Sequence, residues 1–375
     1  MSKHYSVTTL KKNNKKNAIR YIYNQRKSTP HKVAEYLELS RPTVANILKE
    51  LVEEDTIYQE GFANSTGGRK ANIFSFNMSK KIAIGVEIRH DRYEVTAINL
   101  SAQMLKFETF YIPFRNEPVY FDTLSSSINA FINALNVSSD KILGVGIGLQ
   151  ALISSDGKTI IYGKLLDCTG LSISEFTSRI PYPCTFNHDA ESLANSELWF
   201  DSSLSNAIFF NIRDNVSGTV IINRDFFRGG ELKSGVFEHM TLIPDGKQCY
   251  CGKKGCVNAY CSFSALLHPE EDIDSFFSAL RTDDKETKER WEEYLTHLAS
   301  TIDNLHMIIT SDVILGGKIS NYLTQKDIDT LHRKVHKRSA FPSEERYIKT
   351  SKTTSLPLCV GAAIPLVKKY LKLLF

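Results

Sequence analysis

Residues 235–256 read GVFEHMTLIPDGKQCYCGKKGC, and this stretch decides the fold prediction. Three of the chain's seven cysteines lie within its last eight positions, and a histidine lies ten residues before the first of them. Three thiolates and one imidazole complete a tetrahedral zinc shell and leave no position open for a catalytic water. The spacing therefore predicts a structural zinc site with these ligands: His239, Cys249, Cys251 and Cys256. Gly252 and Gly255 permit the tight turns that such a loop needs.

The alternative to a metal site is a group of reduced cysteines that only pack together. The first 20 residues, MSKHYSVTTLKKNNKKNAIR, lack the continuous apolar stretch of a signal peptide. No run of about 18 uncharged apolar residues occurs in the sequence, so we expect no membrane span. We therefore expect a cytoplasmic protein, and in that reducing compartment clustered cysteines more often hold a metal than form disulfides.

Charge is distributed unevenly along the 375 residues. Residues 1–80 hold 14 Lys and Arg against 7 Asp and Glu, whereas the other 295 residues hold 32 basic and 35 acidic side chains. A basic head on a slightly acidic body indicates that the head meets a polyanion. A solvated lysine-rich terminus would have the same composition, so charge alone does not decide between the two.

Residues 1–77 carry the ordered pattern of a winged helix-turn-helix. Helical patterns over 16–25 and 28–39 precede a third over 39–55, which Ser40 is suited to cap. The third pattern has an apolar stripe made by Val44, Ile47, Leu48 and Leu51. A small helical interaction domain is the alternative interpretation of the same helices.

The opposite face of the third helix is polar, and a strand pattern follows it. Residues 56–77 alternate like two strands around a glycine-rich tip, as a wing does. We expect base contacts from Arg41, Thr43 and Asn46. We expect contacts to phosphates or to the minor groove from Lys49, Arg69 and Lys70.

Residues 78–375 have the periodicity of a mixed α/β body. Strand patterns over 81–88 and 93–100 meet at the short turn RHDR and predict a hairpin. A second hairpin pattern starts near residue 206, which indicates two similar lobes. We expect lobe one over about 78–190 together with the closing helix 360–375, and lobe two over about 191–359 with the zinc loop 239–256.

The zinc spacing, taken with the head, resembles the ROK family, named for repressors, open reading frames and sugar kinases. The most specific match is His239 followed by the CxCGxxGC run, and the segments 312–320 (DVILGGKIS) and 360–366 (VGAAIPL) match weaker signatures. The resemblance covers nearly the whole chain. It implies an α/β fold whose two-lobed body is actin-like (ribonuclease H-like) and of the sugar-kinase type. The repressor branch carries an N-terminal winged helix-turn-helix, which the kinase branch lacks.

ROK kinases hold nucleotide phosphates with two glycine-rich loops, and both are altered here. The stretch that matches the first loop, DxGGT, is EIRHD at 87–91, in which bulky side chains replace both glycines. The second loop is reduced to RDNVSG at 213–218, where Asp214 would repel a triphosphate. We therefore expect no ATP-dependent catalysis and no enzyme.

The family's sugar-binding positions are partly retained. Its Asn-Asp pair, in which Asn binds sugar hydroxyls and Asp is the base, is here His188 and Asp189. Its GExGH motif keeps His239, has Val236 in place of the glutamate and places Glu238 two positions further on. The resemblance implies a ligand site made by His188, Asp189, Glu238 and His239. The alternatives are a relict pocket in which Asp189 only caps a helix, and a partner protein that acts on the body.

Together these inferences predict a DNA-binding transcriptional regulator, a repressor of carbohydrate genes that responds to a sugar or sugar derivative. A small head of this type usually needs two copies on a two-fold site, so we expect a homodimer or homotetramer on double-stranded operator DNA. One rival hypothesis is a hexose kinase with a DNA-binding appendage. The other is a ligand-independent DNA-binding protein whose body only dimerises.

Overall fold

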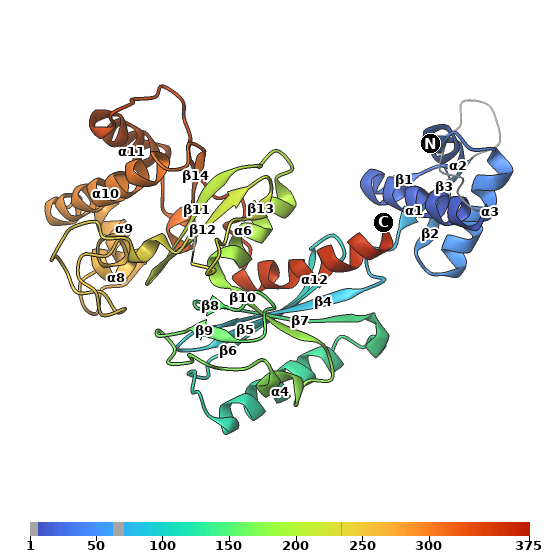
Figure 1. The fold of residues 1–375 in the computed structure, drawn as a ribbon, viewed down its shortest axis with the longest axis horizontal. Coiled ribbons are helices and arrows are strands. Elements are labelled where there is room, and N and C mark those ends of the chain that lie inside the picture. Colours follow the sequence, from blue (N-terminus) through green and yellow to red (C-terminus); the bar gives the residue numbers. More distant parts are fainter. Residues whose placement is uncertain (1–6, 63–70, 234) are drawn as a thin grey trace.

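The structure is a computed structural model that describes residues 7–62, 71–233 and 235–375 (Figure 1). A small N-terminal head lies at one end, and α12 (Leu358–Leu374) extends from it into a larger two-lobed body. Within the described ranges, no helix is long and apolar enough to cross a lipid bilayer. The tip of the predicted wing, with Arg69 and Lys70, lies outside the described residues.

The head has the order of helices and strands that the sequence predicts. Its elements are α1 (Val7–Gln25), β1 (Lys27–Ser28), α2 (Pro30–Leu37), α3 (Arg41–Glu53), β2 (Ile57–Phe62) and β3 (Asn72–Phe76). The three strands form an antiparallel sheet of order β1-β3-β2. The Ser40 side chain accepts a hydrogen bond from the backbone N–H of Thr43, so the predicted cap of α3 is confirmed. α1 extends further toward the N-terminus than the predicted start at residue 16.

Lobe one of the body is built on a five-stranded mixed sheet. Its strands are β4 (Ile82–Ile88), β5 (Tyr93–Asn99), β6 (Met104–Phe110), β7 (Ile142–Leu149) and β10 (Cys184–His188), in the order β10-β7-β4-β5-β6. β4 and β5 form the predicted hairpin, while β7 runs parallel to β4 and β10. α4 (Pro118–Asn133) covers one face of the sheet and α12 the other (Figure 1). Smaller elements are η1 (Ser139–Lys141), β8 (Leu152–Ile153), β9 (Ile160–Tyr162) and α5 (Ser174–Thr177).

Lobe two is built on a second five-stranded sheet, of order β13-β12-β11-β14-β15. Its strands are β11 (Ala207–Ile212), β12 (Val216–Ile222), β13 (Asp225–Phe226), β14 (Asp312–Gly316) and β15 (Ile348–Thr350). β11 and β12 form the second predicted hairpin. The other elements are η2 (Phe237–His239), α7 (Asn258–Cys261), α8 (Phe263–Leu266), α9 (Ile273–Arg281), α10 (Lys285–His306), η3 (Lys318–Asn321) and α11 (Gln325–Arg338). α6 (Asp189–Phe200) joins the lobes and packs on α12, β11 and β12.

Glycines let α12 lie very close to its neighbours. A Cβ on Gly85 of β4 would lie 1.8 Å from the carbonyl oxygen of Cys359, and one on Gly361 would lie 1.7 Å from that of Ser192 in α6. No real Cβ tolerates such distances, so a larger side chain at either position would displace the helix. The small residues near the start of α12 therefore fix its position between the sheet of lobe one and α6.

Head and body share one hydrophobic core. Ile19 and Ile22 of α1 belong to the same buried cluster as Val367 and Leu371 of α12. The head is thus packed against the end of α12 rather than joined to the body by a flexible linker alone.

Candidate metal centre and ligand cleft

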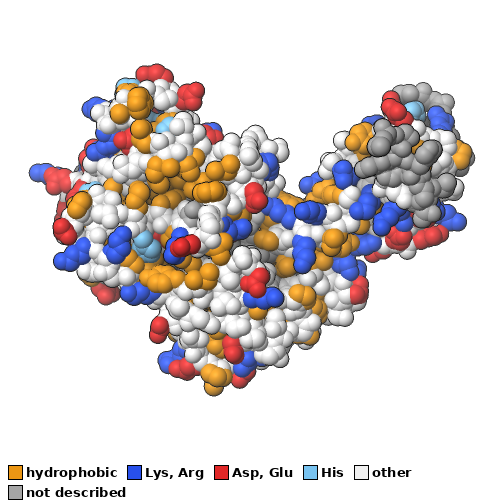
Figure 2. Space-filling model, viewed as in Figure 1, with side chains coloured by type: hydrophobic (Ala, Val, Ile, Leu, Met, Phe, Trp, Pro, Cys, Tyr) orange, Lys and Arg blue, Asp and Glu red, His pale blue; other side chains and the backbone are white. Residues whose placement is uncertain are grey.

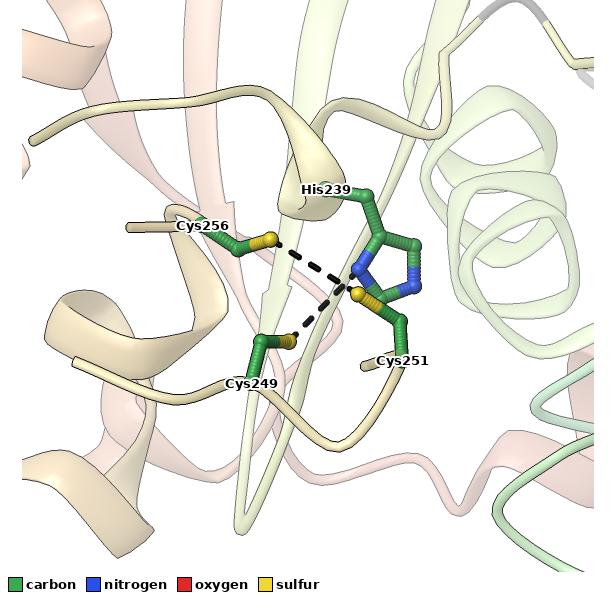
Figure 3. A group of neighbouring side chains, drawn as sticks. All are labelled: His239, Cys249, Cys251 and Cys256. Atoms are coloured by element: carbon green, nitrogen blue, oxygen red, sulfur yellow. Dashed lines mark hydrogen bonds between the residues drawn. The ribbon is translucent and has the colours of Figure 1, made fainter. Parts of the chain in front are cut away.

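The predicted metal ligands converge at one point of lobe two (Figure 3). One ligand atom from each of the four side chains lies within 4.8 Å of the others. Cys249 Sγ is 3.7 Å from His239 Nδ1, and Cys251 Sγ is 3.7 Å from Cys256 Sγ. Bonds of about 2.3 Å to sulfur and about 2.0 Å to nitrogen place the ligand atoms of a tetrahedral zinc roughly 3.5–3.8 Å apart. The observed separations fit such an ion.

Local backbone geometry explains how eight residues bring three thiols together. Gly255 has φ +79°, and a Cβ there would lie 1.8 Å from the carbonyl oxygen of Ile243. Gly252 has φ +97°, which side-chain-bearing residues rarely adopt. The two glycines therefore have the role that the sequence predicts for them.

The electrostatics of the cluster also favour a cation. Burial lowers the pKa of His239, so its imidazole is neutral and available as a ligand. Burial raises the pKa of Cys256 to about 12. Buried thiols of this kind form thiolates when a metal ion compensates their charge. The three thiols and the neutral imidazole therefore suit a metal ion that prefers sulfur and nitrogen ligands.

A cleft between the lobes lies beside the cluster. A cavity of about 510 Å³ includes Glu238, His239 and Tyr250 in its lining, and a cavity of about 650 Å³ includes Asp189. Gln150 and Leu165 line both cavities, so the two adjoin, and His188 lines the smaller one. The four predicted ligand-site residues are thus brought to one cleft.

Asp189 is buried, with 6% of its surface exposed, and only one of its two carboxylate oxygens accepts hydrogen bonds from described residues. Its Oδ2 accepts hydrogen bonds from Asn211 Nδ2 at 2.8 Å and Ser217 Oγ at 2.6 Å. Its Oδ1 lies 3.5 Å from His188 Nδ1 and has no hydrogen-bond partner among the described residues. The carboxylate binds side chains of lobe two rather than the backbone of α6, so the idea that it only caps a helix is wrong.

Glu238, in lobe two, also has a buried carboxylate oxygen without a hydrogen-bond partner among the described residues. It lies in η2, has 3% of its surface exposed, and its Oε2 makes no hydrogen bond within the described chain. Burial raises the pKa of Glu238 well above its usual value. Buried polar atoms normally have partners, so two orphan carboxylate oxygens at one cleft indicate a ligand with hydrogen-bond donors.

Two features of the cleft escaped the sequence analysis. Tyr250 OH lies 3.1 Å from His239 Nε2, which leaves Nδ1 facing the cysteines. Asn211 and Ser217 hold Asp189 from two different strands. The only sequence signal for either feature was a polar residue inside an otherwise apolar or cysteine-rich run.

The residues at the two altered phosphate loops contact one another. Arg213 donates to Glu87, and Arg89 Nη2 lies 3.0 Å from Asp214 Oδ2. β11 ends at Ile212 and β12 starts at Val216, so residues 213–215 form the turn between them. At the position of the two phosphate loops the cavity of about 650 Å³ is therefore lined by paired charged side chains.

The predicted DNA-contacting side chains of α3 are exposed. These are Arg41, Thr43, Asn46 and Lys49. Thr43 Oγ1 is hydrogen-bonded with Ser40 Oγ at 2.8 Å, so its hydroxyl also takes part in the cap. Figure 2 shows further Lys and Arg side chains along the neck between head and body.

A sequence model of the ROK family matches residues 83–369. The chain belongs to the ROK family. The match includes the metal cluster, both orphan carboxylates and most of α12.

Comparisons with individual ROK proteins point in two directions. The xylose repressor of Bacillus subtilis (strain 168) is 25% identical over 84% of this chain and 80% of its own length. A ROK family transcriptional regulator, a homologue of the E. coli MLC protein, has a TM-score of 0.76 at 17% identity and covers 96% of both chains. A ROK family glucokinase from Streptomyces griseus, solved with glucose and AMPPNP, has a TM-score of 0.64 at 19% identity and covers 76% of this chain and 98% of its own. The body thus has the ROK sugar-kinase-like fold.

Proposed function

We propose that the chain is a transcriptional repressor of carbohydrate genes and not an enzyme. Residues 1–77 form the DNA-binding domain, and residues 78–375 form a domain that binds a sugar or sugar derivative and joins the subunits. The carrying observations are a single core that joins the head to α12, and a cleft in which two buried carboxylate oxygens have no hydrogen-bond partner among the described residues.

Operator binding is assigned to α3 and the wing. Arg41, Thr43 and Asn46 reach base edges in the major groove, and Lys49 contacts phosphates together with Arg69 and Lys70. A head with one recognition helix reads a short half-site, so two heads of a homodimer or homotetramer occupy a two-fold operator. The similarity over 84% of the chain to a protein named xylose repressor supports this assignment.

The ligand is assigned to the cleft. A polyol offers several O–H donors, and two of them satisfy Asp189 Oδ1 and Glu238 Oε2. His188 and His239 complete the polar part of the site, and apolar side chains such as Leu152 and Ile161 line its wall. A pocket that reads hydroxyls rejects compounds that leave these oxygens unpaired, which gives selectivity.

Zinc is the metal that best suits His239 and the three cysteines. It supplies a structural cross-link that holds the 249–256 loop and η2 together. Because η2 also carries Glu238, the same loop that binds the metal presents a carboxylate to the cleft. The metal centre therefore fixes one half of the ligand site.

The transmission path is α12. Its first residues face β7, since a Cβ on Gly148 would lie 2.6 Å from Leu358 Cδ2, and its last residues pack on α1. Bridging of the lobes by a ligand changes the angle between them and shifts the heads out of register with the half-sites. A ligand does this only by binding one arrangement more tightly than the other.

ATP turnover with a panel of hexoses separates this proposal from the kinase alternative. We expect no phosphorylation, because bulky and acidic side chains replace the glycine-rich loops that hold nucleotide phosphates in ROK kinases. Sustained sugar-dependent ATP consumption by the purified chain would overturn the assignment as a non-enzyme. DNA binding and its release by sugars, described at the end of the Discussion, test the regulatory assignment itself.

A further inference from the structure

Two ion pairs cross the cleft at the positions of the altered phosphate loops. Arg213, just after β11 of lobe two, donates to the carboxylate of Glu87 in β4 of lobe one. Arg89 of lobe one faces Asp214 of lobe two, with Nη2 and Oδ2 3.0 Å apart. The cation comes from lobe two in the first pair and from lobe one in the second. Each pair therefore joins one lobe to the other.

The two pairs differ in their exposure to water. Only 5% of the Glu87 side chain and 21% of the Arg213 side chain are exposed, whereas 55% of the Asp214 side chain is exposed. Removal of one partner from a buried pair leaves an uncompensated charge, which is strongly unfavourable. An exposed pair is weaker and is screened by salt. Of the two pairs, Glu87 and Arg213 therefore make the stronger contact between the lobes.

Both ends of this contact are fixed to the framework of their lobe. β4 is held by α12 through the close approach of Gly85 to Cys359. On the other side, the backbone N–H of Phe263 donates to the carbonyl oxygen of Arg213 at 2.8 Å, and Ser264 Oγ donates to that of Asp214 at 2.6 Å. Each pair thus joins segments that are anchored in their own lobe.

Three of these four side chains lie between two adjoining cavities. The cavity of about 650 Å³ that contains Asp189 and another of about 640 Å³ share Arg89, His90, Arg213 and Asp214 in their linings. The second cavity reaches Leu356 and Pro357, which precede α12. We call the following four side chains the inter-lobe latch: Glu87, Arg89, Arg213 and Asp214.

We propose that the inter-lobe latch positions the two halves of the effector site. A ligand that binds Asp189 of lobe one and Glu238 of lobe two needs one particular spacing between the lobes. The latch keeps the lobes near this spacing through the protein's own charges, at the place where a kinase binds nucleotide phosphates, and the ligand completes the change of angle. Arg213 and Glu87 are thus positioning residues for a ligand that they do not need to touch.

The latch is directly connected to the effector site. Asn211, which donates to Asp189 Oδ2, lies two residues before Arg213. A change in lobe spacing that breaks the Arg213 contact therefore also moves the partner of Asp189. Without the latch, fewer molecules have the competent spacing, and the apparent affinity for ligand falls in proportion.

Small-angle scattering of the full chain without any sugar tests the latch by itself. The variants are Arg213→Gln, the exposed-pair variant Asp214→Asn, and the charge-reversed double variant Glu87→Arg with Arg213→Glu. Arg179→Gln is the control, because Arg179 pairs with Asp122 and Glu175 within lobe one. We expect a larger radius of gyration for Arg213→Gln, a smaller increase for Asp214→Asn, recovery in the double variant, and no change in the control.

The effector part of this inference rests on the proposed function, so a second readout uses D-xylose and D-glucose as probes. For whichever sugar releases the protein from DNA, Arg213→Gln should raise the half-release concentration by at least about tenfold. An unchanged radius of gyration in both Arg213→Gln and Asp214→Asn would overturn the latch, whatever the sugars do. Expansion that leaves the half-release concentration unchanged would overturn the positioning role. A larger radius of gyration in the variants, with no release of the wild type from DNA by any sugar, would contradict the proposed function but support the latch.

Discussion

Arg20 of the head and Phe375 of α12's end are joined in two ways. Arg20 Nη2 donates a hydrogen bond to the carbonyl oxygen of Phe375 at 3.0 Å, and its guanidinium carbon lies 6.0 Å from the centroid of the Phe375 ring. Tyr23 adds a ring contact with Phe375 at 5.2 Å. These contacts therefore tie α1 of the head to the C-terminal end of α12.

Loss of the Phe375 ring should weaken this connection. In Phe375→Ala, the ring contacts with Tyr23 and Arg20 disappear, while the hydrogen bond from Arg20 to the backbone carbonyl remains and the buried residues of α1 keep the head folded. We expect DNA binding to persist and the sugar-induced change in DNA affinity to shrink severalfold. Anisotropy titrations with and without sugar measure both, and Leu373→Ala is the control because Leu373 is 72% exposed. An undiminished sugar response in Phe375→Ala would show that α12 does not transmit the signal.

Replacement of one metal ligand should remove the metal. Cys251→Ser leaves three ligands, and the free energy of zinc binding, on the order of 10 kcal/mol in small zinc domains, then no longer supports lobe two. We expect stoichiometric zinc to be lost, lobe two to unfold at a lower temperature, and the sugar response to fail with it. Elemental analysis and calorimetry measure the first two effects. Cys184→Ser is the control, because Cys184 lies outside the cluster and this variant should retain zinc. A normal sugar response of metal-free protein would show that the ligand site does not depend on the metal.

Lys368 should make stability depend on pH in the alkaline range. Burial, together with the nearby Arg224 guanidinium, lowers its pKa from 10.5 to about 8, and its Nζ donates to Asn195 Oδ1 at 2.8 Å. Between these two pH values the unfolded chain binds more protons than the native one, so this group makes stability rise with pH there. Below about pH 8, Lys368 is charged in both the folded and the unfolded state, and the full free-energy cost of its buried charge lowers the stability of the native state.

Lys368→Met tests this dependence. It removes the buried charge and should raise stability at neutral pH by up to about 3 kcal/mol, less about 1 kcal/mol for the hydrogen bond to Asn195. It should also flatten the rise above pH 8, as urea unfolding at several pH values would reveal. Lys369→Met, at an exposed neighbouring position, is the control. Equal pH profiles for the wild type and Lys368→Met would contradict the assignment.

Substitutions on α3 should separate sequence reading from phosphate binding. Arg41→Ala and Asn46→Ala should each cost about 1–3 kcal/mol on the operator and little on unrelated DNA. Lys49→Ala should weaken binding to all sequences and reduce the salt slope by about 1. Lys285→Ala, in lobe two, is a matched control for loss of a cation. An equal loss of affinity for all DNA sequences in Arg41→Ala would show that Arg41 contacts the DNA backbone rather than the bases.

The sequence was most informative where function depends on residues close together in the chain. The spacing of His239 and the three cysteines, the Ser40 cap and the hairpin of β4 and β5 each follow from local patterns, and the structure contains them. The pairing of Glu87 with Arg213 joins residues 126 positions apart. The sequence shows that both glycine-rich loops are lost. It does not show that the side chains replacing them pair with each other. The docking of α1 on α12 likewise depends on packing between the two ends of the chain.

The most direct test of the central claim is fluorescence anisotropy on DNA from upstream of the protein's own gene. The protein is titrated at fixed salt, because phosphate-driven affinity is salt-dependent, and a panel of sugars, sugar phosphates and amino sugars is then added. We expect specific binding that one compound releases. We also expect that Asp189→Asn needs at least about tenfold more of that compound, while Glu191→Gln, whose carboxylate pairs with Arg228, does not. Specific binding that no compound changes, or release unaffected by Asp189→Asn, would contradict the central claim.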